Sequence, residues 1–227
     1  MKYKSEDLRV KKMSKRSYNQ YCAVARAMDI VGERWTLLIV RELLPGPKRF
    51  KDLLEGLPGI GTNLLTARLK DLEGYGVVCR ATLPPPAASR VYELTDLGRS
   101  LEPVVMSLAR WGLEFLGASR KEEDRQPAWA MVAVKSVLEA EATVETRESY
   151  EFRVDDEVFH VRIEDDETEV RQGSAADPAL VVRSDTQTLL AVAAGRAEPA
   201  EALASGAIGI EGDWEARERC VRMLGAR

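Results

Sequence analysis

Apolar residues in the first third of the chain recur at the three- and four-residue spacings of amphipathic helices. Proline and glycine separate these runs, most clearly at Pro45-Gly46-Pro47 and at Leu57-Pro58-Gly59. The pattern predicts four helices, at 22–30, from near residue 33 to the Pro45 stop, at 49–55 and at 61–75. The apolar positions that we expect to face a core are Val24, Ala27, Met28, Val31, Trp35, Leu38, Ile39, Leu43, Phe50, Leu53 and Leu54.

After the fourth helix the apolar period shortens to two residues, as in strands. Two β-rich runs, 77–83 and 90–94, flank the proline-rich segment 84–89, which predicts a hairpin with a long, projecting tip. Thr95 has the chemistry of an N-cap for a long fifth helix to about residue 116, in which Pro103 should cause a kink. Six apolar residues follow a period of about 3.5, typical of a helix-on-helix seam: Leu97, Leu101, Val104, Leu108, Trp111 and Phe115.

The second half of the chain mixes both periods. A polar, charge-dense segment at 119–127 predicts a linker, so we expect a basic arm at 1–20, one domain at 21–118 and a second at 128–227. The second domain should be an α+β unit of about 100 residues. Its predicted helices are 129–138, 185–194, 199–204 and 214–224, and its predicted strands are 143–147, 149–154, 157–163, 167–171, 179–183 and 208–211.

Three helices, a fourth helix, a hairpin and a further helix follow one another in the order of a winged helix-turn-helix domain. At 100° per residue, Leu65, Leu69 and Leu72 form one ridge of the fourth helix, for the core. The opposite face carries Asn63, Thr66, Ala67 and Lys70, which suits a helix that enters a DNA major groove. Arg68 lies on the shoulder of the leucine ridge, where it would either pair internally or contact a phosphate. Taken alone, such a helix is better explained as a surface helix with a solvated face. The hairpin that follows it, flanked by Arg80 and Arg90, favours DNA binding instead.

Charge separates the two halves. The chain carries a formal net charge of −4, with +7 on residues 1–120 and −11 on residues 121–227. The basic half favours a polyanionic partner, with the arm at 1–20 either a phosphate-contacting segment or a solvated tail.

Several classes of protein are excluded. The longest uncharged stretch has twelve residues, 56–67, whereas a membrane-spanning helix needs about 20. Three distant cysteines and the single His160 argue against a disulfide framework, a zinc site and a histidine-based catalytic centre. We expect a cytoplasmic protein without a cofactor, a metal or a catalytic residue.

The first half resembles the HxlR-type transcription regulators over residues 21–117. The matching marks are Cys22, Gly32 to Trp35, Arg41-Glu42-Leu43, Arg49-Phe50, the leucine-rich fourth helix, and Leu94-Thr95 with Gly98. The resemblance implies a homodimer on a pseudo-palindromic operator, with terminal helices at the dimer interface, which agrees with the 3.5-residue seam. It places Trp35 in the core. We expect DNA contacts from Lys48, Arg49, Thr62, Asn63, Thr66, Ala67, Arg68, Lys70, Arg80, Ser89 and Arg90.

Members of this family often sense oxidants or electrophiles through the cysteine that matches Cys22. Arg16 and Arg26 are near in sequence and a helix begins here, conditions that favour a reactive thiolate. The alternative is a small buried hydrophobe. Cys79 and Cys220 are expected to be packing residues.

The second half resembles sterol-carrier-protein-like domains over about residues 128–225, most closely at Asp185, Leu189-Leu190, Gly195, Glu201-Ala202, Gly206 and Glu211-Gly212-Asp213. The resemblance implies a layer of helices over a mainly antiparallel sheet, with an apolar cavity for a lipid-like effector. Candidate lining residues are Trp129, Phe152, Phe159, Leu189, Leu190 and Leu203. A filled core would have the same sequence pattern.

The sequence thus predicts a dimeric, DNA-binding transcription regulator whose second domain binds an apolar effector or assists assembly. The competing interpretation is a lipid-binding or other hydrophobic-ligand-binding protein whose winged helix makes protein contacts. The basic arm and wing favour DNA.

Overall fold

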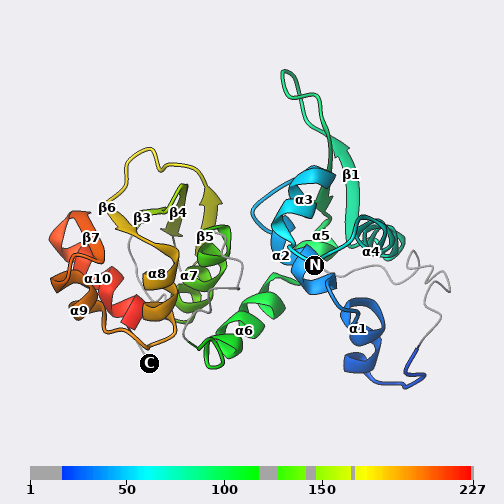
Figure 1. Cartoon of the computed structure of the whole chain (residues 1–227), viewed down its shortest axis with the longest axis horizontal. Helices are drawn as coiled ribbons and strands as arrows, with labels where there is room; N and C mark the ends of the chain where they lie inside the picture. The colour runs from blue at the N-terminus through cyan, green and yellow to red at the C-terminus, as the bar shows by residue number, and fades with distance from the viewer. Residues whose placement is uncertain (1–16, 118–126, 142–146, 165–166, 226–227) are drawn as a thin grey trace. The chain divides into compact units, whose positions relative to one another are not determined.

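The computed structural model describes residues 17–117, 127–141, 147–164 and 167–225, which divide into two compact units, 1–102 and 103–227 (Figure 1). The predicted arm, up to residue 16, and most of the predicted linker lie outside the described residues. The domain boundaries of the sequence analysis therefore remain predictions.

The first unit has the predicted order of helices and strands. Helices α1 (Ala23–Val31), α2 (Thr36–Leu43), α3 (Phe50–Gly56) and α4 (Thr62–Gly74) precede strands β1 (Val78–Thr82) and β2 (Arg90–Leu94). Its buried apolar side chains come from every one of these elements: Ala25, Val31, Ile39, Val40, Leu43, Leu53, Leu65, Leu69, Leu72, Val78, Val91 and Leu94. Because each element contributes only one face to this core, the opposite faces remain for other contacts.

The hairpin is antiparallel and runs from the pair Val78 and Leu94 to the pair Thr82 and Arg90. Its tip extends away from the helices, as the proline-rich segment predicts (Figure 1). Lys48, between α2 and α3, exchanges two backbone hydrogen bonds with Tyr92 of β2, at 2.9 and 2.8 Å. The wing is therefore fastened to the helical part at its base.

The predicted long fifth helix is wrong in one respect, because the segment forms two helices. Helix α5 (Asp96–Arg99) is capped by Thr95, whose hydroxyl oxygen accepts the Gly98 N–H at 3.1 Å. Helix α6 (Glu102–Leu113) begins after Ser100, with Pro103 in its first turn. Proline has no N–H, and its ring would clash with the Arg99 carbonyl in a continuous helix. The chain therefore breaks before Pro103 instead of kinking at it.

The second unit is a five-stranded sheet with helices packed on one face. Strands β3 (Glu148–Val154), β4 (Glu157–Glu164), β5 (Glu167–Gln172), β6 (Leu180–Ser184) and β7 (Ile208–Gly212) have the order β5-β4-β3-β6-β7. Among the strand pairs of the described residues, β3–β6 is parallel and the other three pairs of this sheet are antiparallel. The helices are α7 (Pro127–Glu141), α8 (Thr186–Ala193), α9 (Pro199–Ala204) and α10 (Trp214–Gly225). The predicted α+β domain is confirmed; of the strand predicted at 143–147, only Arg147 is described, and it is not in a strand.

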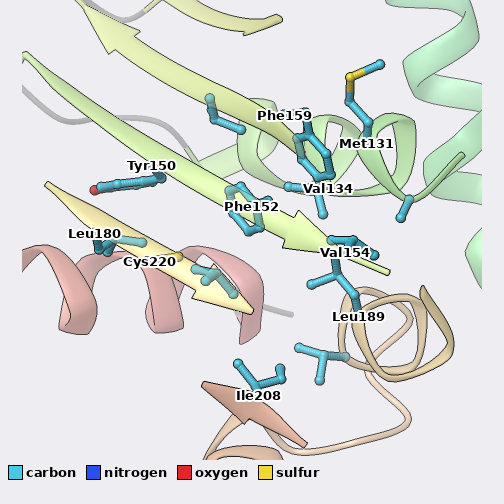
Figure 2. Packing of buried hydrophobic residues seen from close by; sticks show 14 of the residues in the cluster. Met131, Val134, Tyr150, Phe152, Val154, Phe159, Leu180, Leu189, Ile208 and Cys220 are labelled. Atoms are coloured by element: carbon cyan, nitrogen blue, oxygen red, sulfur yellow. The ribbon is translucent and has the colours of Figure 1, made fainter. Parts of the chain in front are cut away.

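The core of this unit lies between the sheet and the helices. Alternate residues of β3, namely Tyr150, Phe152 and Val154, are fully buried, and the Phe152 ring stacks on Phe159 of β4 at 5.1 Å between centroids (Figure 2). Met131 of α7, Leu189 of α8 and Cys220 of α10 belong to the same cluster. The other face of the sheet therefore carries the intervening polar residues of each strand.

Helix α6, nearly all of which belongs to the second unit, packs one side against helices α7 and α8. Leu113 packs in a second apolar cluster with Ala133 and Val137 of α7, together with Ala193 and Ala194 at the end of α8. The Arg110 Nε donates a hydrogen bond of 3.1 Å to the Ser136 carbonyl. The stripe of Val104, Leu108, Trp111 and Phe115 lies on the opposite side of the helix from Leu113.

Candidate nucleic-acid interface

Helix α4 has the two faces that its sequence predicts. Leu65, Leu69 and Leu72 are at most 1% exposed, which fixes the rotation of the helix on the core. The exposed residues of the other face are Thr62, Asn63, Thr66, Ala67 and Lys70. The predicted orientation of the helix is confirmed, while its contacts with DNA remain a prediction.

The exposed face of α4 offers hydrogen-bonding groups. Within the described part of the chain, neither the Asn63 amide nor the Lys70 ammonium has a side-chain partner. Thr66 donates its hydroxyl hydrogen to the Thr62 carbonyl at 2.8 Å, which leaves the oxygen free to accept. An amide beside an ammonium is the combination that reads a base edge and holds a phosphate.

Arg68 pairs internally, the first of the two alternatives that its position allowed. Its guanidinium reaches Glu33 at 2.8 Å and Asp71 at 3.2 Å, and its side chain is only 19% exposed. It therefore joins the middle of α4 to the segment before α2, and a phosphate would have to displace a carboxylate to reach it.

Lys48 also forms an ion pair with a carboxylate. Its ammonium lies 2.8 Å from Glu42, whose side chain is 2% exposed and which also binds Arg41 at 2.8 Å. Burial lowers the pKa of Arg41, and the neighbouring Glu42 opposes that shift. Since Lys48 also pairs with Tyr92, this buried cluster positions the wing. The sequence analysis predicted that Lys48 contacts DNA, and it did not identify Glu42 as a buried, charged partner.

Three exposed cations of the first unit come from three different segments. Arg49 precedes α3, Lys70 lies on α4 and Arg90 begins β2; all three side chains are exposed and have no side-chain partner among the described residues. Arg80 of β1 pairs with Glu73 at 2.7 Å and lies 5.6 Å from the Tyr92 ring, although it remains 66% exposed. Ser89 donates to the Ala87 carbonyl at 2.7 Å, inside the wing tip.

Trp35 is not a fully buried core residue, contrary to expectation. It is half-buried, has a left-handed backbone with a φ of 80°, and stacks below the Arg34 guanidinium at 5.2 Å from the ring centroid. Its ring also lies close to Gly59, where an added Cβ would be 3.7 Å away. A bulky residue with positive φ is rare, so neighbouring contacts must hold it.

Two helices expose apolar residues that their sequences predicted to be covered. On α1 and just before it, Tyr21, Val24 and Met28 are 107%, 70% and 40% exposed. On α6 and just after it, four residues are between 45% and 69% exposed: Val104, Leu108, Trp111 and Phe115. The Trp111 and Phe115 rings lie 4.7 Å apart. Leu97 is 37% exposed, and Leu101 is half-buried. Exposed apolar residues that gather on one helix face are typical of interaction surfaces, so a dimer contact through α6 remains a prediction.

The three cysteines differ in environment. Cys22 is exposed at the N-cap of α1. Cys79 is half-buried, and burial together with Glu93 raises the pKa of its thiol. Cys220 is fully buried, which raises its pKa to about 12. Cys79 and Cys220 are therefore poor nucleophiles, as expected of packing residues; a sensor role for Cys22 remains a prediction.

The six candidate pocket residues of the second domain do not share one environment. Phe152, Phe159 and Leu189 are buried in the main core, and Leu203 packs against it. Leu190 packs instead against the cluster around Leu113, and Trp129 is half-buried. An apolar ligand cavity at this position remains a prediction.

No helix within the described ranges is both long and apolar enough to cross a membrane. The described residues also hold no group of three or more His, Cys, Asp or Glu side chains that could bind a metal ion.

A three-helix core, a polar recognition helix and a basic wing define a winged helix-turn-helix DNA-binding protein. Residues 30–120 match the HxlR-like helix-turn-helix family, and residues 132–224 match the SCP-2 sterol transfer family. The chain belongs to the HxlR-like family of transcription regulators, in which it carries an SCP-2-like second domain. Both are non-enzymatic kinds of domain.

Characterised and uncharacterised relatives match the first half. The uncharacterised HTH-type regulator YvaP of Bacillus subtilis is 38% identical over 94 residues, which cover 41% of this chain and 87% of YvaP. The regulator YodB of the same species is 38% identical over 89 residues, 39% of this chain and 80% of YodB. Among solved structures, the reduced form of YodB from Bacillus subtilis has 34% identity and a TM-score of 0.38; the match covers 44% of this chain and 100% of that chain.

Proposed function

We propose that this regulator binds a pseudo-palindromic operator as a homodimer, with α4 of each copy in a major groove. The observation that carries this proposal is the exposed Asn63, Thr66 and Lys70 face of α4. The exposed cations Arg49 and Arg90, which have no side-chain partner among the described residues, support it. Phosphate contacts would supply most of the affinity, and Asn63 with its neighbours the sequence preference. The wing arginines Arg80 and Arg90 would contact the flanking backbone.

Replacing Lys70 and Asn63 separates affinity from specificity. Lys70→Ala should weaken binding to operator and scrambled duplexes alike and reduce the slope of log K against log salt by about 1. Asn63→Ala should weaken the binding free energy for the operator by about 1–3 kcal/mol and leave the affinity for the scrambled duplex unchanged. Titrations of both variants at two salt concentrations measure this, with Lys51→Ala as the matched control, since Lys51 is exposed on α3 and paired with Glu55 at 3.4 Å. Full affinity in both variants would refute the assignment of the recognition helix.

Cys22 is proposed as a thiol sensor, because it is exposed at a helix N-terminus. Diamide treatment should then lower the operator affinity of the native chain at least tenfold, and Cys22→Ser should be insensitive. A Cys79→Ser variant serves as control, because its thiol has a raised pKa. Equal diamide sensitivity of the native chain and Cys22→Ser would exclude this role.

The second domain is proposed to bind an effector, which the SCP-2 match supports. The finer expectation is an apolar molecule between sheet and helices, near Phe152, Phe159 and Leu189. A hydrophobic-ligand carrier without DNA binding is the alternative that the same match favours, and a gel shift with bulk DNA distinguishes the two. We further propose a cytoplasmic location and no catalytic role.

A further inference from the structure

The short segment between α1 and α2 contacts the recognition helix α4 and the turn that precedes it. Residues 32–35 separate the end of α1 at Val31 from the start of α2 at Thr36. Glu33 reaches the middle of α4, and the Trp35 ring lies close to the turn between α3 and α4. The segment is therefore joined to α4 at two points, although at least 26 residues of sequence separate them from it.

The first contact is an ion pair. The Arg68 Nη2 atom donates to the Glu33 carboxylate at 2.8 Å, and Nη1 donates to Asp71 of the same helix at 3.2 Å. The Arg68 Nε atom is buried without a hydrogen-bond partner among the described residues. Because a buried donor without a partner is unfavourable, the two carboxylates must stabilise this guanidinium. Glu33 is the one of the two that comes from outside α4.

The second contact is made by a tryptophan with a strained backbone. Trp35 is the N-cap residue of α2, its φ is 80°, and its carbonyl accepts the Ile39 N–H at 2.8 Å. This backbone directs the ring toward Gly59, two residues before the N-cap of α4 at Gly61. Strained residues of this kind persist where the surrounding structure holds them, and they are frequent at functional positions. The strain at Trp35 thus accompanies a contact with the turn that starts α4.

The ion pair holds α4 from the side opposite to its exposed polar face. At 100° per residue, Arg68 projects about 140–160° around the helix from Asn63, Thr66 and Lys70. The proposed DNA contacts and the contact with Glu33 therefore lie on different sides of α4. Glu33 can influence the placement of the helix without touching DNA.

The leucine ridge and the ion pair constrain α4 in different ways. Leu65, Leu69 and Leu72 bury one side of the helix, which sets its rotation. Apolar burial is non-directional, so a ridge of this kind tolerates small shifts along the helix axis. A hydrogen-bonded ion pair depends on distance and angle and resists such shifts. The Arg68 pair with Glu33 therefore adds a constraint on the position of α4 along its axis.

Base recognition needs this constraint more than phosphate attraction does. A binding constellation must be held within about 0.5 Å of its productive geometry, whereas attraction between a cation and the phosphates is sequence-independent and tolerant of small shifts. We propose that Glu33 is a positioning residue for sequence recognition, which acts through Arg68 to place Asn63 against its base. This inference rests on the proposed function of α4.

Glu33→Ala tests the inference by the sign of its effect. The Glu33 side chain is 51% exposed, so the variant is expected to fold. By charge alone, loss of a carboxylate should tighten binding to every duplex. Positioning predicts the opposite for an operator selected with the native chain from a random duplex pool: binding about five- to tenfold weaker, with affinity for a scrambled duplex equal to native or higher. Titrations of the full-length protein at one salt concentration measure both.

A second variant tests whether Glu33 acts through Arg68. Arg68→Gln should lower the ratio of operator to scrambled affinity by a similar factor, and the double variant should have the same ratio as Arg68→Gln alone. Glu55→Ala is the matched control, since it removes an exposed carboxylate whose partner Lys51 lies on α3 at 3.4 Å, and its ratio should be native.

Three results would overturn the inference: native or tighter operator binding by Glu33→Ala, an equal loss on both duplexes, or a double variant with a lower ratio than Arg68→Gln. Asn63→Ala and Lys70→Ala on the same duplexes keep the proposed function separate. If these two variants lose affinity as expected while Glu33→Ala binds like the native chain, the inference alone fails. If neither variant loses affinity, the proposed role of α4 fails and the inference fails with it.

Discussion

The Trp111→Glu variant is expected to be monomeric and to lose operator binding by about 100-fold or more. Trp111 lies at the centre of the apolar stripe of α6, 65% exposed, with Phe115 beside it at 69%. If a second copy covers this stripe, a glutamate there is buried without a partner and the dimer cannot form. A monomer engages only one half-site, so the gain from simultaneous binding to two half-sites is lost. Sedimentation velocity and operator titration of the same sample measure both effects.

The control for this prediction adds the same charge elsewhere. Ala204→Glu changes an exposed residue of α9 and should leave both the oligomeric state and the DNA affinity unchanged. A Trp111→Glu protein that sediments as a native-like dimer would show that the stripe serves another contact. Loss of secondary structure in the circular dichroism spectrum would call for Leu108→Gln, a milder change in the same stripe. Leu108→Gln should weaken the dimer by at least tenfold, and an unchanged dimer in that folded variant would refute the interface.

Periodicity predicted most of the helices and strands because each element packs one face on a core. The three leucines of α4 are a clear case, since their spacing alone fixed which side of the helix faces out. The same reasoning located the alternating strands of the second domain. Periodicity does not tell which apolar faces are covered, so it also predicted burial for Val24 and Met28 of α1, which the structure shows exposed.

Other features depend on contacts between residues distant in sequence. Arg68 could be placed on the shoulder of α4 from its angle, but the approach of Glu33, 35 residues earlier, follows only from the packing of the helices. A solvent-open pocket of the second unit likewise combines residues 147–149, two residues of β4 and the loop at 175–179, which are far apart in sequence. The break before Pro103 was signalled by the proline, yet whether the helix bends or restarts depends on the Thr95 cap and the short α5.

Glu42 is the most consequential residue that sequence patterns left without a role. It occupies a position between Ile39 and Leu43 on α2, where a helical period would predict an apolar side chain. Its carboxylate lies against Gly56 of α3, where an added Cβ would come within 2.4 Å of its Oε2 atom. It binds Arg41 and Lys48 in a cluster where the two cations are 17% and 22% exposed. The carboxylate therefore joins α2, α3 and the base of the wing.

Glu42→Ala should lower the free energy of unfolding of the first unit by about 3 kcal/mol, because two poorly solvated cations lose their counter-charge. Urea unfolding of the full chain, followed by hydrogen exchange of peptides from α2 and α3, measures this change. Glu55→Ala is the control: its pair with Lys51 has side chains 65% and 82% exposed, so its loss should cost below about 1 kcal/mol.

A double variant shows why replacing Glu42 lowers the free energy of unfolding. If the unpaired cation is responsible, Glu42→Leu combined with Lys48→Met should recover part of the stability that Glu42→Leu alone loses, because an apolar pair of similar volume replaces the ion pair. If the loss reflects only the space left by the side chain, Glu42→Leu should be close to native and Lys48→Met should add nothing. The comparison therefore decides whether the wing is fastened by charge or by packing, because Lys48 carries both the ion pair and the backbone bridge to Tyr92.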